Sequence, residues 1–145
     1  MSEPVSIMVA GRATVDLIME IDQFSVRAEK FKASNSLFVV GGPGANASIA
    51  IARFGGRPSL ITYLGDDMMG KFIHQKLTDE GVDLSMSIIS PNAQSSVSAA
   101  FVDSRGERQT FNFPGKGFSE LPNALKPDFK PRAILADNRH SELTK

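Results

Sequence analysis

The sequence contains no cysteine among its 145 residues, and its two histidines, His74 and His140, are isolated from each other. Without cysteine the chain has neither a disulfide framework nor thiolate ligands for a metal. Two isolated histidines do not make a zinc site, so no metal site is expected from these residues. The absence of cysteine also suits the reducing cytosol, and we expect a cytoplasmic protein.

An excess of positive charge is also missing, because 16 basic residues balance 16 acidic ones and no dense Lys/Arg cluster occurs. This balance lacks the electrostatic footprint of a nucleic-acid-binding protein. Long apolar runs are absent too. Val5 to Ala10 is far too short to cross a bilayer, and it lacks the basic start and small-residue cleavage site of a secretory signal. We therefore expect neither nucleic acid nor a membrane as a partner.

A composition of 41% hydrophobic and 22% charged residues is typical of one globular domain. Its most informative stretch runs from Gly41 to Gly56: glycines first, then an apolar segment that we predict to be a buried helix. Asn46 lies at the start of this helix. A buried carboxamide needs a hydrogen-bonding partner, and the hydroxyl groups of a ligand are one candidate.

Short apolar runs alternate with helical patterns along the chain. Residues 5–10, 60–64 and 133–136 read as strands buried in a parallel sheet. After Gly65, Asp66 or Asp67 caps an amphipathic helix that ends near Glu80, before Gly81. Strands that alternate with helices indicate βαβ units and an α/β fold.

Two further regions predict a small antiparallel sheet beside the layered domain. Residues 97–102 and 108–113 flank a glycine-containing turn and read as a hairpin, with Arg108, Thr110 and Asn112 on one face of its second strand. Residues near 31–40 suggest another strand. Such a sheet is placed to cover a pocket at the carboxyl ends of the parallel strands.

The segment from Gly42 to Ala47 begins like a dinucleotide-binding fingerprint, but Ala47 stands where the third glycine belongs. The segment also lies about thirty residues beyond the first strand instead of directly after it, and Pro43 removes a backbone donor from the turn. A dinucleotide-dependent oxidoreductase therefore remains only an alternative, which predicts binding of a nicotinamide cofactor.

Together, several features resemble the ribokinase-like (PfkB) carbohydrate kinase family: the stretch from Gly41 to Ser48, the following Phe54-Gly55, and Gly65-Asp66-Asp67 with Gly70. Further similarity runs from Val9-Ala10-Gly11 to the turn at 103–108, and so covers nearly the whole chain. The resemblance implies a ribokinase-like three-layer fold, a parallel sheet with flanking helices, plus a small β lid. Residues 1–145 would be the N-terminal part of a single such domain, incomplete at its C-terminus, with lid strands around 12–40 and 95–114.

Members of that family transfer the γ-phosphoryl group of ATP to a hydroxyl of a sugar or a sugar-like alcohol. By this resemblance Asp16 accepts hydrogen bonds from sugar hydroxyls, Gly42 lets the ligand approach the backbone, and Asn46 holds another hydroxyl. A carboxylate that accepts from two hydroxyls fixes orientation, which phosphoryl transfer chiefly requires. The alternative for Asp16 is an exposed loop carboxylate, and we expect Arg12 to be a solvated surface side chain.

The segment from Ala136 to His140 places a guanidinium at the end of a predicted strand. It is similar to the subgroup acting on anionic sugars, including sulfofructose kinases, in which an arginine here and an asparagine in a lid strand meet the acidic group. Arg139 and Asn112 are the matching positions, and a planar guanidinium suits a sulfonate, phosphate or carboxylate. The alternative for Arg139 is a surface arginine in a loop.

The family's second signature, a Gly-Ala-Gly-Asp turn that supplies the catalytic base, does not occur in this sequence. No catalytic residue is therefore assigned, ATP and Mg²⁺ are implied only for the full-length family, and we expect this chain to be inactive alone. Ser141 reads as the cap of a final helix.

The leading hypothesis is thus the sugar-binding half of an ATP-dependent carbohydrate kinase, whose substrate is a sugar and for which an anionic ketose is a candidate. The alternative is a non-catalytic sugar-binding or interaction module that lost the transferase half. The resemblance also offers a homodimer through the lid strands.

Overall fold

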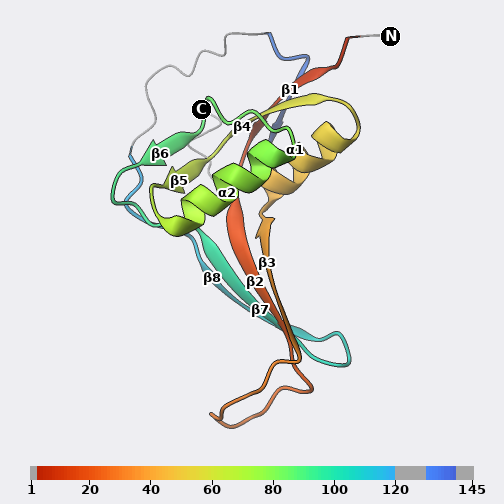
Figure 1. The fold of residues 1–145 in the computed structure, drawn as a ribbon, viewed down its shortest axis with the longest axis vertical. Helices are drawn as coiled ribbons and strands as arrows, with labels where there is room; N and C mark the ends of the chain where they lie inside the picture. The colour runs from red at the N-terminus through yellow and green to blue at the C-terminus, as the bar shows by residue number, and fades with distance from the viewer. Residues whose placement is uncertain (1–2, 120–129, 140–145) are drawn as a thin grey trace.

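The computed structural model describes residues 3–119 and 130–139 (Figure 1). Its elements are, in chain order, β1 (Ser6–Ala10), β2 (Thr14–Glu20), β3 (Asn35–Gly41), α1 (Pro43–Arg53), β4 (Arg57–Ile61), β5 (Tyr63–Gly65), α2 (Met68–Asp79), β6 (Ile88–Ser90), β7 (Val97–Val102), β8 (Arg108–Phe113) and β9 (Ala133–Ala136).

A parallel sheet in the order β4-β1-β9 organises the core, as the apolar runs predict. Val9 of β1 lies in register with Leu60 and Leu135 on the two neighbouring strands. Around it lies a cluster of buried apolar side chains, which includes Val9, Val15, Ala45, Leu60, Leu64, Ile73 and Leu77. The sheet therefore brings the ends of β1 and β9 together at one edge of the core.

Helix α1 packs against β1 and β4, but it is not the fully buried helix that its composition predicts. Only Gly44, Ala45 and Ser48 are buried, and Phe54 at its end is almost fully exposed. Small side chains on one face allow close packing on the sheet, and the other face remains in solvent.

Helix α2 confirms the predicted boundaries. Asp67 is its N-cap and accepts a hydrogen bond from the Gly70 N–H at 2.8 Å. Its C-cap is Glu80, and Gly81 follows in the left-handed conformation with a φ of 80°.

The predicted strand over 60–64 is in fact two strands that belong to different sheets. β4 pairs with β1, whereas β5 pairs with β6 in a separate two-stranded sheet. Thr62 lies between them, fully buried, and its hydroxyl accepts a hydrogen bond from the Ala13 N–H at 3.1 Å. This bond ties the residue between β4 and β5 to the segment after β1.

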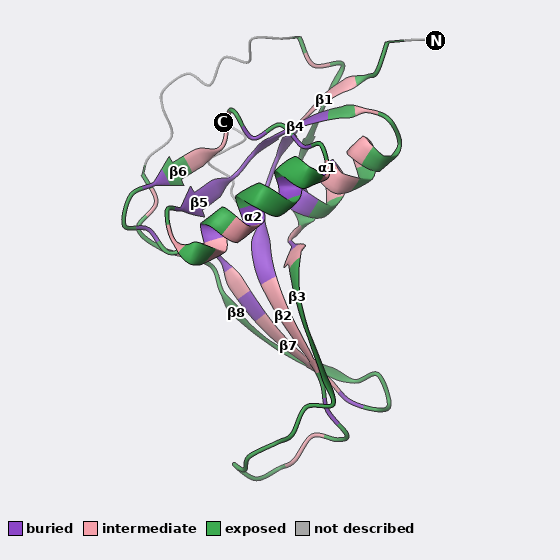
Figure 2. Ribbon diagram, in the orientation of Figure 1, coloured by how far each residue is buried: buried purple, intermediate pink, exposed green. Residues whose placement is uncertain are grey.

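A second large sheet, in the order β3-β2-β7-β8, projects away from the two helices (Figure 1). We call it the projecting sheet. It is mixed and not antiparallel as expected, because β2 and β7 run parallel while the outer pairs are antiparallel. Its buried residues lie near the core, and its far end is mostly exposed (Figure 2).

No helix of the described residues is long and apolar enough to cross a membrane. The predicted cap Ser141 and the isolated His140 lie outside the described residues.

Candidate functional site

An open cavity of about 520 Å³ lies where the projecting sheet leaves the core, and we call it the root cavity. It brings together all five residues that the sequence singled out for ligand binding. Its lining is formed by Arg12, Thr14, Asp16, Gly42, Pro43, Asn46, Ser98, Arg108, Thr110, Asn112 and Arg139.

Asp16 lies in the middle of β2 and is half-buried, so it is not an exposed loop carboxylate. Its Oδ1 atom is buried and has no hydrogen-bond partner within the described residues. Burial raises the pKa of the Asp16 carboxyl above its ordinary value, and hydrogen bonding from Ser98 opposes that rise. Asp16 thus brings to the cavity lining a carboxylate with one buried oxygen that lacks a donor.

Three adjacent strands form a polar row across the projecting sheet. Asp16 of β2 is in register with Ser98 of β7, and Ser98 is in register with Asn112 of β8. The Asn112 amide donates to the Ser98 hydroxyl at 2.9 Å. The row places the Asp16 carboxylate and the Asn112 amide on the face that lines the cavity, with the Ser98 hydroxyl between them.

Gly41 makes room for the Asp16 carboxylate, because a Cβ at this position would collide with it. Gly42 follows with a φ of 93°, and a Cβ there would meet the Arg12 carbonyl oxygen. Both glycines thus fit close approaches within the chain itself.

The N-terminus of α1 is already occupied by the chain. The Arg12 carbonyl oxygen accepts hydrogen bonds from the N–H groups of Gly44 at 3.0 Å and Ala45 at 3.3 Å. Gly44 also lies so close to Gly11 that neither position has space for a side chain. The glycine-rich turn therefore allows close packing of the backbone and does not form an open phosphate-binding site.

Asn46 lines the root cavity but is exposed, which corrects the expectation of a buried amide. Its side chain makes no hydrogen bond within the part of the chain that the structure describes. In the first turn of α1, Gly44 and Ala45 are buried, whereas Pro43 and Asn46 line the cavity, so the Asn46 amide is accessible to a ligand.

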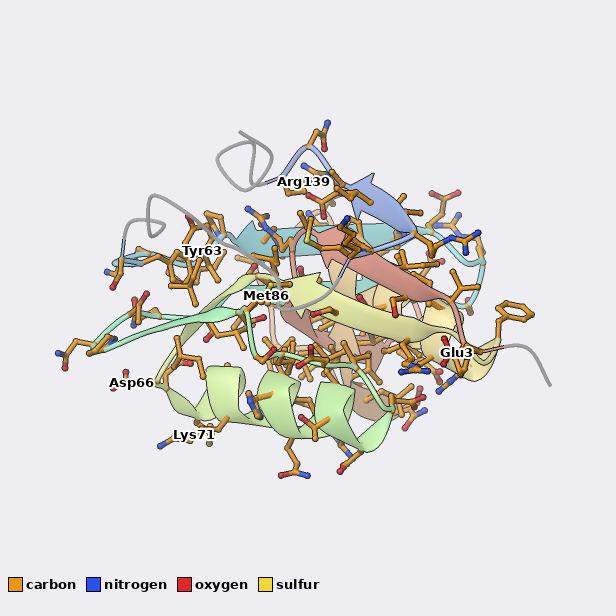
Figure 3. The ribbon with its side chains drawn as sticks, turned by 90° about the horizontal axis from the view of Figure 1, so that it is seen from above. Glu3, Tyr63, Asp66, Lys71, Met86 and Arg139 are labelled. Carbon is orange, nitrogen blue, oxygen red and sulfur yellow. The ribbon has the colours of Figure 1, made fainter. Side chains whose placement is uncertain are left out.

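Arg139 follows the end of β9, on the side of the molecule opposite α2 and Lys71 (Figure 3). Arg12 follows β1, and it lines the cavity and is not a solvated surface side chain as expected. Its Nε atom is buried without a partner among the described residues. Two arginines thus come to the cavity from strand ends that the core sheet places side by side.

Sequence reasoning missed six of the lining residues: Arg12, Thr14, Pro43, Ser98, Arg108 and Thr110. Strand alternation could have found most of them. Thr14 precedes Asp16 by two positions, Arg108 and Thr110 share the predicted polar face of Asn112, and the hairpin turn fixes Ser98 opposite Asn112.

Cavities of similar volume occur elsewhere, so chemistry and not size distinguishes the root cavity. One groove of about 480 Å³ is lined mainly by apolar residues around Val5 and Phe54. Among residues 3–119 and 130–139, no cluster of three or more His, Asp or Glu side chains is arranged to hold a metal ion.

Comparison with known proteins gives one consistent result. The model of the family described as pfkB family carbohydrate kinase matches residues 5–144. The aminoimidazole riboside kinase of Salmonella typhimurium is 32% identical over 124 residues, which cover 83% of this chain and 35% of that protein.

Solved structures agree. The ribokinase of Arabidopsis thaliana, solved with ribose and ATP, is 26% identical with a TM-score of 0.68 and matches 79% of this chain and 37% of its own. The ribokinase of Cryptococcus neoformans, solved with ADP, shares the fold at 22% identity and a TM-score of 0.77, over 93% of this chain and 42% of its own. The chain spans between 31% and 39% of the length of the first three curated relatives.

Proposed function

Because the chain belongs to the pfkB family of carbohydrate kinases, we propose that its root cavity binds the sugar that is phosphorylated. In this role Asp16 accepts hydrogen bonds from sugar hydroxyls, Asn46 holds a further hydroxyl, and Gly42 contributes backbone to the wall that the ligand approaches. Family membership leaves the dinucleotide-dependent oxidoreductase without support.

The observation that carries the proposal is the unpartnered, buried Oδ1 atom of Asp16 in a cavity lined by polar side chains. A sugar supplies neighbouring hydroxyl donors, and hydrogen bonds to a carboxylate contribute about 1.5–3 kcal/mol each. Such bonds fix the orientation of the alcohol, which is the main contribution that phosphoryl transfer asks of the substrate side.

We further propose that the substrate is an anionic ketose, with Arg139 and Asn112 near its acidic group. The support is that both line the root cavity, although they are separated by 27 positions in the chain: Asn112 lies on the projecting sheet, and Arg139 follows β9 of the core sheet. A guanidinium beside an amide suits a sulfonate, phosphate or carboxylate.

ATP and Mg²⁺ belong to the proposed reaction, in which ATP supplies the transferred phosphoryl group. The sequence of residues 1–145 has no Gly-Ala-Gly-Asp turn, and the described residues present no metal cluster. We therefore propose that this chain contributes the sugar side and that, alone, it binds sugar without phosphorylating it.

Calorimetry with the full chain and a panel of ketohexoses, neutral and anionic, tests sugar binding, and mass spectrometry after incubation with ATP and Mg²⁺ tests phosphorylation. We expect Asn46→Ala to weaken binding about tenfold, because one hydroxyl loses its partner. The matched control is Asn35→Ala, at the far end of β3, which leaves affinity unchanged. If no sugar binds, the proposal is wrong. If a phosphorylated product forms, the chain alone does more than bind sugar, which contradicts the second part of the proposal.

The alternative is a sugar-binding or interaction module without any transferase partner. It shares the root cavity, so binding data do not separate the two. The nucleotide sequence that follows the Lys145 codon does: a Gly-Ala-Gly-Asp segment there, in frame or shifted, favours the kinase.

A further inference from the structure

One carboxylate joins the loops that carry two of the cavity's arginines. The backbone N–H of Arg12 donates to Asp137 Oδ2 at 2.8 Å, and the backbone N–H of Arg139 donates to Asp137 Oδ1 at 2.8 Å. Gly11 permits this arrangement, because a Cβ there would collide with the Asp137 carboxylate. The segments after β1 and after β9 are therefore tied together at a single side chain.

The charges of the root cavity do not cancel among the residues that line it. Three arginines face one carboxylate, that of Asp16. The ion pairs found among the described residues, Arg53 with Glu80 and Arg105 with Asp103, lie outside the cavity. The lining thus has positive charge in excess, and an anion is the ligand that neutralises it.

Part of this excess positive charge is located at Arg12. Its Nε atom is buried and has no acceptor within the described residues. A buried donor without a partner destabilises the folded state, and the penalty is larger when the donor is charged. A ligand oxygen that meets this donor removes the cost.

We propose that Arg12 and Arg139 form one two-guanidinium site for a tetrahedral oxyanion carried by the substrate, and that Asp137 is the positioning residue that holds both. This inference rests on the proposed sugar-binding function of the root cavity. Each guanidinium offers paired N–H donors in a plane, and two such forks match the several oxygens of a phosphate or sulfonate group. The sugar then lies between this site and Asp16.

Arg108 has a different role, although it lines the same cavity. It lies four residues from Asn112 along β8, which is about 13 Å of extended strand, in register with Val102 toward the far end of the projecting sheet. Its contribution is long-range attraction of the anion, and salt screens such attraction.

Calorimetry on the full chain with fructose, fructose 6-phosphate and the corresponding 6-sulfonate tests the site. We expect an anionic sugar to bind at least about thirtyfold more tightly than fructose, and Arg12→Gln to reduce this preference about tenfold while the affinity for fructose persists. Between the phosphate and the sulfonate, the more tightly bound sugar identifies the group that the site takes.

Two arginine variants serve as controls. Arg132→Gln, exposed before β9 and outside the cavity, leaves the preference unchanged. Arg108→Gln lowers it less than Arg12→Gln does, and its effect disappears in about 0.5 M salt because a distant charge is screened.

Asp137→Asn separates positioning from general structural damage. The amide retains one acceptor oxygen but presents an N–H₂ group to the second backbone donor, so one of the two arginine loops is released. We expect the preference for the anionic sugar to fall while fructose still binds. An equal loss of affinity for both sugars, at an unchanged melting temperature, would falsify the positioning role.

The outcomes separate this inference from the function on which it rests. If fructose binds and neither anionic sugar binds more tightly, the oxyanion site is wrong and the sugar site stands. An anion preference that survives Arg12→Gln likewise overturns the role of Arg12. If no sugar binds, the sugar-binding function fails, and the oxyanion site fails with it.

Discussion

Asp16 lies where its surroundings disfavour the ionised form of its carboxyl group. Burial raises the pKa of its carboxyl above the ordinary value of 3.8, so the native state binds a proton more readily than the unfolded chain does. Stability therefore falls as the pH rises through this range, and the full destabilisation is present above the raised pKa. A carboxylate kept at such a cost is suited to a ligand that supplies donors.

We expect Asp16→Asn to raise the melting temperature at pH 7 and to weaken sugar binding about 10- to 100-fold, because the charged acceptor is lost. Thermal unfolding from pH 7 down to pH 4 checks the sign. The gain in stability narrows as the pH falls, because Asp16 of the wild type becomes protonated. Asp22→Asn, at an exposed position, is the matched control, and an equal gain there would remove Asp16 from the explanation.

Gly41 acts on the site through the space that it leaves. In Gly41→Ala the new methyl group displaces the Asp16 carboxylate, which has a short side chain and must rotate away. We expect about tenfold weaker sugar binding. Isothermal titration measures it, with Ser36→Ala on the exposed part of β3 as control. Unchanged affinity would show that the ligand does not need the carboxylate where the structure has it.

The candidate site was predictable from the sequence in part. Asp16, Gly42, Asn46, Asn112 and Arg139 were named through a family resemblance, and all five line one cavity. Arg12 was not found, because its position depends on Asp137, which lies 125 residues later in the chain. Pairings over such a distance have no local pattern in the sequence.

Among the elements, α2 is tied to the projecting sheet by its own cap. Asp67 accepts from the Gly70 N–H and the Ser95 hydroxyl through Oδ1, and from the Ser95 N–H at 2.9 Å through Oδ2. Burial alone would raise its pKa, but these hydrogen bonds together lower the pKa of Asp67 below 3.8. One carboxylate thus fixes both the first turn of α2 and the segment that leads into β7.

We expect Asp67→Ala to lower the free energy of unfolding by about 1–3 kcal/mol, through the lost cap and the Ser95 donors left unpaired. The matched control, Asp66→Ala, removes a bond to the Asn92 N–H alone and costs less. Urea denaturation measures both. The wild-type advantage is present above pH 3.8 and is lost as the pH falls through the lowered pKa, because protonation weakens the carboxylate as an acceptor. Equal losses for the two variants would contradict the tie between α2 and β7.

The sequence predicted the type of most elements but not how all of them pair. Apolar runs identified β1 and β9, and the glycine-containing turn identified the hairpin of β7 and β8. The parallel pairing of β2 with β7 was missed, because these strands are separated by four strands and two helices in the chain. The break at Thr62 was also missed, because a buried threonine is as common within a strand as at its end.

At the scale of the whole molecule, two exposed apolar surfaces are candidate sites for self-association of the chain. Strand β9 is an edge strand whose successive residues Ile134 and Leu135 are 64% and 47% exposed, so both of its faces are uncovered among the described residues. The projecting sheet exposes Phe38 and Phe111. Unpaired edges and apolar patches favour association.

We expect the chain to associate with increasing concentration, and sedimentation velocity on two single variants to identify the surface. Ile134→Lys places a charge on the edge of β9, and Phe111→Lys places one on the projecting sheet. A shift to monomer in Phe111→Lys alone supports the homodimer through the projecting sheet. A shift in Ile134→Lys alone assigns association to β9 and contradicts that dimer.

The polar row of Asp16, Ser98 and Asn112 also constrains how the protein acquires its site in time. About eighty residues of chain separate Asp16 from Ser98, and Arg139 joins from still farther along. Contacts between residues so far apart in the sequence form slowly, because the entropy cost of closing the intervening loop comes before the contacts can stabilise it. During synthesis from the N-terminus, β1, α1 and β4 are able to assemble early, whereas the binding surface is completed only after β9 has emerged from the ribosome.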